Sequence, residues 1–386
     1  MKVRLGEYIK EYSFRNKADE DIPVYSVTNS HGFCRDYFGK EVASKDKKTY
    51  KIVPRGCFAY NPSRINVGSV DWQRDMDRVI VSPLYIVFSV SEKLDQQYLF
   101  YYLKSDIALH YIKAAATGSV RDNLKFNSLC NFFIEIPSLN KQRQIVRKIN
   151  LIRSIIEKCE IQLGKYDALI KARFVELFGN PIKNEKHWGI CKLGDCLKRI
   201  DNGKSFTCDV QARIGEHPAI LKLSAVTYGD YRPEENKALL DEKQFIDSAE
   251  VHSGDLLFTR KNTPELVGMA AYVYNTPAHL MMPDLIFRLV PNERMTAIFL
   301  WQLINNREFR PVIQSIAGGS AKSMSNISKE RLSNISVIYP PIDEQIKLNE
   351  MIYQVNKSKF CNMNIILKGG GLYENKFFIF RRKKRV

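Results

Sequence analysis

The sequence predicts an α+β protein in which two similar mixed α/β domains are separated by long helices. Three observations predict this fold: a sustained heptad pattern after residue 141, a repeated order of segments at a period of roughly 200 residues, and short apolar runs punctuated by glycine, proline and asparagine. The chain of 386 residues is long enough for two or three domains with sizeable cores. The expected architecture is an internal repeat, a pseudo-dimer within one chain.

The heptad pattern lies between Lys141 and Phe178. Apolar residues follow one another at alternating steps of four and three, and no proline interrupts them. Such a seam is typical of a long helix that packs against another helix, although a long core helix of an ordinary α/β protein would share the periodicity. The seam positions are Ile145, Ile149, Ile152, Ile156, Cys159, Leu163, Tyr166 and Ile170.

Residues 1–140 are expected to form the first domain, and the long spacer helix follows at 141–180. The segment 94–113 has helical spacing, and a loop of small residues with Gly118, Ser119 and Arg121 comes after it. Short apolar runs bounded by turn residues predict strands. These runs are 24–27, 57–60, 79–81, 84–90 and 132–136.

Residues 181–340 repeat the order of the first domain. The loop 112–121 corresponds to 313–322, because both copies hold Gly-Ser, one spacer and a cation. Each copy then passes through a strand and a proline to a glutamine at a helix start, Gln142 in the first copy and Gln345 in the second. Further correspondences are 3–7 with 191–195, 53–56 with 251–254, Ser82-Pro83 with Met282-Pro283, and Tyr98-Leu99 with Phe299-Leu300.

A second spacer helix is expected at 341–368, where Leu348, Ile352 and Val355 repeat the seam. The two helices can pair as an antiparallel coiled coil that holds one domain at each end. Three consecutive glycines at 369–371 cost roughly 2–3 kcal/mol in a helix, so the helix is expected to stop there. Residues 369–386 match nothing in the first copy and are interpreted as a basic, disordered tail. A slipped reading frame that replaced the native helix end is the alternative hypothesis.

The charge of the chain is strongly basic. Lys and Arg number 59 against 42 acids, a net charge of +17. Such a balance most often indicates a polyanionic partner, and nucleic acid is the commonest. No apolar run is long enough to span a membrane and the N-terminus resembles no secretory signal, so we expect a cytoplasmic protein with free thiols.

A basic protein with two related domains on a fixed spacer is suited to reading two DNA half-sites. In two-headed DNA readers the protein geometry sets the half-site spacing, typically one helical turn of about 10 bp. Because the two halves of this chain are related but not identical, the expected target is bipartite and asymmetric.

The chain resembles the HsdS-type specificity subunits of type I restriction-modification systems, from residue 1 to the region of Leu367. The duplication carries the resemblance, together with the two Gly-Ser-x-Arg/Lys loops, the proline and glutamine at each helix start, and the Leu177-Phe-Gly-Asn-Pro181 close of the first helix. The resemblance implies that 1–140 and 181–340 are target-recognition domains, each reading one half of a split site in double-stranded DNA. It implies helices that set the spacing and dock two methyltransferase subunits, with optional translocating nuclease subunits. S-adenosylmethionine, ATP and Mg²⁺ would then sit on those partners, and no cofactor on this chain.

No catalytic or metal site is predicted on the chain itself. The nearest match to the [Asn/Asp]-Pro-Pro-[Tyr/Phe] turn of amino-methyltransferases is the segment 61–64, which lacks the second proline and the aromatic residue. A P-loop is absent, and Asp230, Glu235 and Lys237 lack the flanking strands of a nuclease site. The group His187, Cys191, Cys196 and Cys208 matches no zinc spacing.

The candidates for DNA contact are cations, amides and small residues in polar loops. Arg and Asn can read guanine and adenine edges bidentately, although such cations equally position phosphate or remain solvated. The Gly-Ser loops could offer backbone N–H groups to phosphate or serve only as turns. The candidates are Arg55, Arg64, Arg74, Gly118, Ser119, Arg121, Arg260, Lys261, Asn262, Gly319, Ser320 and Lys322.

Three other functions stay open at this point. The first is a fused methyltransferase or nuclease with its own active site. The second is the recognition subunit of a methylation-only or single-complex type II system. The third is a basic scaffold that binds RNA or protein without sequence preference. The charged face of the helix 141–178 also allows solvent, a partner subunit or the DNA backbone as its neighbour.

Overall fold

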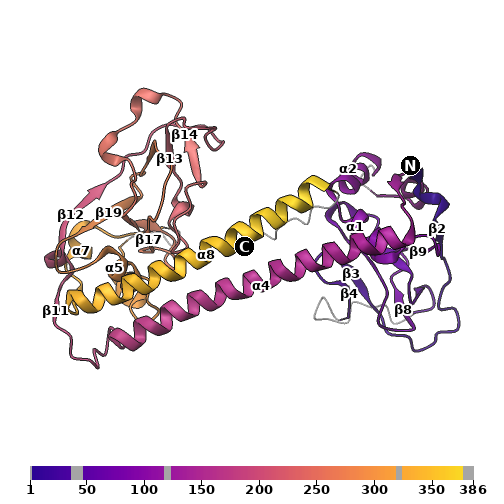
Figure 1. The fold of residues 1–386 in the computed structure, drawn as a ribbon, viewed down its shortest axis with the longest axis horizontal. Coiled ribbons are helices and arrows are strands. Elements are labelled where there is room, and N and C mark those ends of the chain that lie inside the picture. The colour runs from indigo at the N-terminus through magenta and orange to yellow at the C-terminus, as the bar shows by residue number, and fades with distance from the viewer. Residues whose placement is uncertain (1, 36–46, 117–122, 319–323, 377–386) are drawn as a thin grey trace. The chain divides into compact units, whose positions relative to one another are not determined.

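The computed structural model describes residues 2–35, 47–116, 123–318 and 324–376, with side chains to Leu367 (Figure 1). The chain divides into two compact units. Unit 1 comprises residues 1–161 and 361–386, and unit 2 comprises residues 162–360. Two long helices contribute to both units, α4 (Leu139–Phe178) and α8 (Ile342–Lys376).

Unit 1 is built on a four-stranded antiparallel sheet with the strand order β2-β9-β6-β7. These strands are β2 (Ile9–Glu11), β9 (Ile86–Val90), β6 (Phe58–Tyr60) and β7 (Val70–Trp72). Three two-stranded sheets pair β1 (Lys2–Arg4) with β10 (Phe133–Glu135), β3 (Ser26–Thr28) with β4 (Gly32–Cys34), and β5 (Lys51–Pro54) with β8 (Arg78–Val81). The other elements are α1 (Gln96–Leu103), α2 (Asp106–Ala115), α3 (Phe126–Cys130), and the 3₁₀ turns η1 (Leu5–Glu7) and η2 (Ile65–Val67).

Unit 2 repeats this plan with the sheet order β12-β19-β15-β17. These strands are β12 (Leu197–Asn202), β19 (Ile286–Pro291), β15 (Leu256–Thr259) and β17 (Ala270–Tyr272). A three-stranded sheet has the order β14 (Asn236–Ala238), β13 (Ala219–Leu221) and β18 (Leu280–Met281). Two two-stranded sheets pair β11 (Ile190–Lys192) with β21 (Ser336–Ile338) and β16 (Lys261–Asn262) with β20 (Ser325–Asn326). The helical elements are α5 (Ala297–Ile304), α6 (Arg310–Ser315), α7 (Lys329–Ser333), η3 (Leu193–Cys196), η4 (Leu223–Ala225), η5 (Glu242–Gln244) and η6 (Asp247–Ala249).

Equivalent local signals start equivalent helices in the two units. Asp95 caps α1 by accepting a hydrogen bond from the backbone N–H of Tyr98 at 3.0 Å. Thr296 caps α5 in the same way, with Phe299 N at 3.1 Å. Each cap satisfies a backbone N–H that the helix itself leaves unpaired. Both helices then bury their aromatic and leucine side chains against the four-stranded sheet of their own unit.

The two glutamines of the repeat, Gln142 and Gln345, make equivalent hydrogen bonds. The Oε1 atom of Gln142 accepts from Asp95 N at 2.8 Å, and its Nε2 donates to the carbonyls of Lys93 and Pro137. Gln345 makes the matching set, with Thr296 N at 2.8 Å and the carbonyls of Arg294 and Pro340. Both glutamines are fully buried. The proline-to-glutamine motif therefore ties the start of each long helix to the cap of the short helix beside it.

The Leu-Gly pair near the start of each unit marks a close approach of two segments. A Cβ atom on Gly6 would lie 2.8 Å from the Cβ of Cys130 in α3. A Cβ atom on Gly194 would lie 3.1 Å from the Cβ of Ser333 in α7. Only glycine lets these segments pack so closely, which explains why the repeat keeps it at both places.

The seam of α4 divides between the two cores. Ile149 is part of the core of unit 1, and Ile145, Ile152 and Ile156 pack against that core. The first half of the seam therefore covers its own globular domain, a contact that the prediction of a helix–helix seam did not include. Ile170 lies in the core of unit 2, whereas Leu163 is half-buried.

The helix pair expected from the sequence is present in unit 2, where α4 and α8 run side by side and antiparallel (Figure 1). Six side chains of the pair share one core cluster with the sheet and α5. They are Ile170, Phe174 and Phe178 from α4 with Leu348, Ile352 and Val355 from α8. An ion pair between Asp167 and Lys359 flanks this apolar contact.

The predicted end of α8 at residue 368 is wrong, because the helix continues to Lys376 through the three glycines. Glycine lowers helix propensity by about 1 kcal/mol per residue, but it keeps the backbone N–H and adds no steric clash, in contrast to proline. The part of the predicted tail from 369 to 376 is helical, and residues 377–386 lie outside the described residues.

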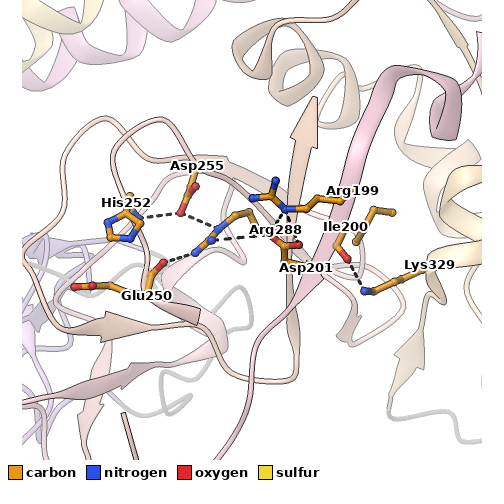
Figure 2. A network of polar contacts seen from close by, with 8 residues as sticks. All are labelled: Arg199, Ile200, Asp201, Glu250, His252, Asp255, Arg288 and Lys329. Atoms are coloured by element: carbon orange, nitrogen blue, oxygen red, sulfur yellow. Dashed lines mark hydrogen bonds and ion pairs between the residues drawn. The ribbon is translucent and has the colours of Figure 1, made fainter. Parts of the chain in front are cut away.

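A polar network holds the sheet of unit 2 together (Figure 2). The guanidinium of Arg288 on β19 is buried, with Nε 2.9 Å from the Asp255 carboxylate and Nη1 4.0 Å from that of Asp201 on β12. Its Nη2 donates to the carbonyl of Glu250, and Asp201 also pairs with Arg199. Desolvation raises the pKa of Asp255, and the hydrogen bond from His252 N and the charge of Arg288 oppose that shift. The network is internal to the unit and links two strands with the turn before β15.

Candidate nucleic-acid interface

Unit 1 has a cavity of about 860 Å³ beside β3 and the segment that follows β6. Side chains with amide, hydroxyl or guanidinium groups line part of it. They include Asn29, Asn61, Ser63, Arg64, Asn66 and Asn123. Amide and guanidinium groups can match the donor and acceptor pattern of base edges, so the cavity offers the chemistry that direct readout requires.

Arg64 is the predicted contact residue that the structure places best. Its side chain is exposed on the rim of the cavity, and none of the described side chains forms an ion pair with it. Asn123, which lines the same cavity, directly follows the segment 117–122, and Leu124 N donates to the Pro62 carbonyl at 3.1 Å. The described chain therefore resumes at this cavity with Asn123 and Leu124. Gly118, Ser119 and Arg121 themselves lie outside the described residues.

Arg55 and Arg74 are engaged within unit 1. Arg74 donates to the Asp71 carboxylate at 2.6 Å and lies over the Trp72 ring at 4.9 Å from its centroid. Arg55 is more exposed and pairs with Asp77 at 3.3 Å. Arg74 thus stabilises the turn after β7, and Arg55 has a weaker, surface ion pair.

In unit 2 the described cations Arg260 and Lys261 lie in and beside a short strand pair that Gly318 also joins. Strand β16, which holds Lys261, pairs with β20, and Gly318 forms a bridge with Asn326. The bridge residues Gly318 and Asn326 therefore lie at the edge of the strand pair that holds Lys261. Gly319, Ser320 and Lys322 lie outside the described residues.

Arg260 and Lys261 are oriented by specific neighbours. The Arg260 guanidinium lies 5.0 Å from the centroid of the Phe287 ring and donates to Asn326 Oδ1 at 3.3 Å. Lys261 Nζ lies 3.7 Å from the Asp284 carboxylate. Both side chains are half-buried, which keeps their cationic groups at the surface in defined positions.

Asn262 does not agree with its predicted role as a base-contact residue. It is 7% exposed, its Nδ2 donates to Thr227 Oγ1 at 3.1 Å, and its Oδ1 accepts from Thr263 N at 2.9 Å. Both ends of the amide are therefore used inside the unit. Alternation explains the difference, because neighbouring residues on a strand point to opposite faces and Lys261 takes the outward one.

Two cations that the sequence analysis missed lie beside this group. Lys329 Nζ is 5.8 Å from the centroid of the Phe287 ring and donates to the Ile200 carbonyl. Lys204 N donates to the Met282 carbonyl at 3.0 Å, in the segment next to Asp284. They come from two separate parts of the chain, both distant in sequence from Arg260 and Lys261, so no local motif marks them. In the part of the chain that the structure describes, no three His, Cys, Asp or Glu side chains are placed to hold a metal ion.

Comparisons with known proteins agree with a DNA-recognition domain. The family model described as a type I restriction modification DNA specificity domain matches residues 2–163. The EcoEI type I restriction enzyme specificity subunit of Escherichia coli is 31% identical over 198 residues, which cover 50% of this chain and 33% of that subunit. The EcoKI specificity subunit of Escherichia coli strain K12 is 22% identical over 275 residues, 67% of this chain and 58% of that subunit. The StySPI specificity subunit of Salmonella potsdam is 20% identical over 375 residues, 92% of this chain and 79% of that subunit.

Two solved structures share the fold. A chain from a type I restriction-modification system, studied for complex assembly and conformational transition, matches with a TM-score of 0.56 and 18% identity over 96% of this chain and 95% of that one. The type I specificity subunit from M. genitalium matches with a TM-score of 0.55 and 12% identity over 99% of this chain and 96% of that one.

These findings show that residues 2–163 match a type I DNA specificity domain and that the chain shares the fold of solved type I restriction-modification structures, a duplicated α+β unit with long helices. The family model matches residues 2–163, less than half of the chain, and the specificity subunits and solved structures named above are proteins to which this chain is similar. The chain aligns with a third of the length of the EcoEI subunit and with just over half of the EcoKI subunit. No helix in the described part of the chain is long and apolar enough to cross a bilayer.

Proposed function

We propose that this chain is the DNA-recognition subunit of a type I restriction-modification complex and that each unit reads one half of a bipartite, asymmetric DNA site. The observation that carries the proposal is the duplication of one fold with different polar side chains at the matching surface. Unit 1 presents Arg64 among asparagine amides, and unit 2 presents Arg260 and Lys261 among further lysines. Two copies of one scaffold with different surface chemistry are suited to two different half-sites.

The cations of these surfaces have two separable tasks in the proposal. Those held by aromatic rings or carbonyl groups, such as Arg260 and Lys329, are placed to position the phosphate backbone. The amides and Arg64 around the cavity of unit 1 are placed to meet base edges. The net charge of +17 supplies the general attraction to DNA, which falls as salt increases.

We further propose that the long helices set the distance between the half-sites and dock two methyltransferase subunits. On α8, Ile346, Tyr353 and Phe360 recur at intervals of seven residues and are exposed. On α4 of the same unit, Leu169 and Val175 are exposed as well. Apolar side chains repeated along a helix face are typical of a surface that packs against a partner helix.

In this proposal the chemistry belongs to the partner subunits. Methyl transfer with S-adenosylmethionine takes place on the methyltransferase subunits, and translocation and cleavage with ATP and Mg²⁺ take place on restriction subunits where the complex includes them. The residues of this chain select the site and orient the partners.

The proposal is tested by sequencing the methylated bases of cells with and without this gene. We expect a bipartite, asymmetric methylated motif that is lost when the gene is deleted and returns when it is restored on a plasmid. A methylation pattern that is the same in the three strains would contradict the proposed function. Plating of phage with unmethylated DNA on the same strains then reports whether a restriction subunit acts with this chain.

A further inference from the structure

Both units have a turn with a proline at the same point of the topology. It comes just before the strand that is second in the order of the four-stranded sheet, β9 in unit 1 and β19 in unit 2. In unit 1, Tyr85 N donates to the Ser82 carbonyl at 3.0 Å and the chain enters β9. In unit 2, Ile286 N donates to the Pro283 carbonyl at 3.2 Å and the chain enters β19. The residue after the proline is Leu84 in unit 1 and Asp284 in unit 2. The two hydrogen bonds align Leu84 with Leu285 and Pro83 with Asp284, so the turn presents an exposed leucine in unit 1 and, one position earlier, an acidic side chain in unit 2.

Leu84 is an exposed apolar side chain on the mixed polar and apolar lining of the cavity in unit 1. It is 77% exposed, so it contributes little to the core of unit 1. It nevertheless lines the same cavity as Arg64 and Asn61. A single exposed leucine is ordinary on a protein surface, but one that lines a cavity together with guanidinium and amide groups can add the apolar contact that distinguishes the methyl group of thymine.

Asp284 is a fixed carboxylate on a basic surface. Its Oδ1 accepts from Ser205 Oγ at 2.5 Å, and its Oδ2 lies 3.7 Å from Lys261 Nζ. The side chain is 47% exposed, and a carboxylate can accept about four hydrogen bonds, so acceptor sites remain open toward solvent. A carboxylate repels phosphate. Its place beside Lys261 on a basic surface therefore favours contact with a hydrogen-bond donor of the DNA.

We propose that this turn is a specificity-determining element of both units. Leu84 contacts the methyl group of a thymine in the half-site of unit 1. Asp284 accepts a hydrogen bond from the N4 amino group of a cytosine in the half-site of unit 2, the major-groove donor that acidic side chains recognise. This inference rests on the proposed function and adds to it the residues that choose one base in each half-site.

The test is methylome sequencing of cells that carry the complete gene cluster with Leu84→Asp or Asp284→Leu. Each variant is expected to relax or change one base position in one half of the motif, with discrimination at that position reduced on the order of tenfold. The other half of the motif and the spacing between the halves stay as in the wild type. Leu240→Asp is the matched control, because Leu240 is also exposed but lies outside the turn.

The outcomes separate this inference from the proposed function. If both variants methylate the wild-type motif with unchanged discrimination at every position, the turn does not read bases, while the proposed function stands. If deletion of the gene itself leaves the motif in place, the proposed function fails. If a variant loses methylation, the affinity of the purified variant complex is measured for a set of duplexes in which each position of the motif carries each of the four bases in turn. Loss confined to one position supports the inference, and equal loss on all duplexes overturns it.

Discussion

At the scale of single residues, the two buried glutamines contribute more to the stability of the fold than any of the predicted contact residues. Gln142 and Gln345 each satisfy one backbone N–H and two carbonyl groups at the junction of a long helix with its domain. A buried polar group that loses its partner costs about 1–3 kcal/mol. The junction of each unit with its long helix therefore depends on one buried side chain.

Replacement of Gln142 by Leu is expected to lower the free energy of unfolding of unit 1 by about 2–4 kcal/mol, because three backbone groups would lose their hydrogen-bond partner. Urea denaturation followed by tyrosine and tryptophan fluorescence measures the change. Gln162→Leu on the same helix is the control, because Gln162 is exposed and donates to the Tyr166 hydroxyl. Equal effects of the two substitutions would contradict the role given to Gln142.

Lys104 gives unit 1 a pH dependence. It is buried, donates to the Gly68 carbonyl, and burial lowers its pKa from 10.5 to about 8, with Asp71 opposing and Arg153 assisting the shift. Between these two pH values the unfolded chain binds more protons than the folded one, so the free energy of unfolding rises with pH. Below pH 8 the lysine is charged in both states and the full cost of burying the charge applies.

Compared with Lys104→Met, the wild type is expected to gain about 2 kcal/mol of stability between pH 8 and 9.5. Denaturation of both proteins at a series of pH values measures this difference. Comparison with the variant cancels the contribution of the buried Cys57 thiol and of the other groups whose pKa burial raises. Parallel stability curves for the two proteins would show that Lys104 does not titrate in this window.

At the scale of elements, glycine has opposite roles in the long helix and in the turn beside strand β1. Gly164 lies within α4, and a Cβ atom there would meet no other atom within 4 Å. Gly6 lies in η1, where a Cβ atom would be 2.8 Å from Cys130. The first glycine is a weak point of a helix, whereas the second permits two segments to touch.

Gly164→Ala is therefore expected to stabilise the protein by about 1 kcal/mol, since alanine favours the helix and no clash opposes it. Gly6→Ala is expected to destabilise it by about 1–3 kcal/mol, because the new methyl group overpacks a buried contact. Thermal unfolding followed by circular dichroism measures both changes. Shifts of the same sign in the two variants would argue against this assignment of roles.

The elements also show why some of the site could be predicted and some could not. The duplication, the glutamine motif and the seam are sequential patterns, so spacing alone indicated the units and the helix pair. Asn262 was selected by residue type, yet strand alternation turns it inward. Lys204 and Lys329 join the cations of unit 2 from distant segments, and only the folded sheet brings them there. The end of α8 was misplaced because propensity weighs each glycine but not the continuity of the backbone.

At the scale of the whole molecule, the positive charge and the chosen side chains should make separate contributions to DNA binding. Electrostatic attraction to phosphate acts on every sequence and weakens as counterions compete. Contacts to base edges act on one sequence and depend little on salt. A protein of net charge +17 therefore needs the second kind of contact to find its site among other DNA.

Arg64 is expected to contribute to sequence-selective binding, since it is exposed on the cavity of unit 1 and has no ionic partner among the described side chains. In the assembled complex, Arg64→Gln should weaken binding to an unmethylated duplex that contains the recognition motif on the order of tenfold. Binding to duplexes without the motif should stay nearly unchanged. Titrations at several salt concentrations measure both affinities. Arg55→Gln is the matched control, because Arg55 is also exposed but pairs with Asp77. If Arg64→Gln instead weakens all duplexes equally and reduces the dependence on log salt by about one, Arg64 contacts phosphate rather than a base, and recognition by unit 1 then depends on the asparagine amides and the turn at Leu84.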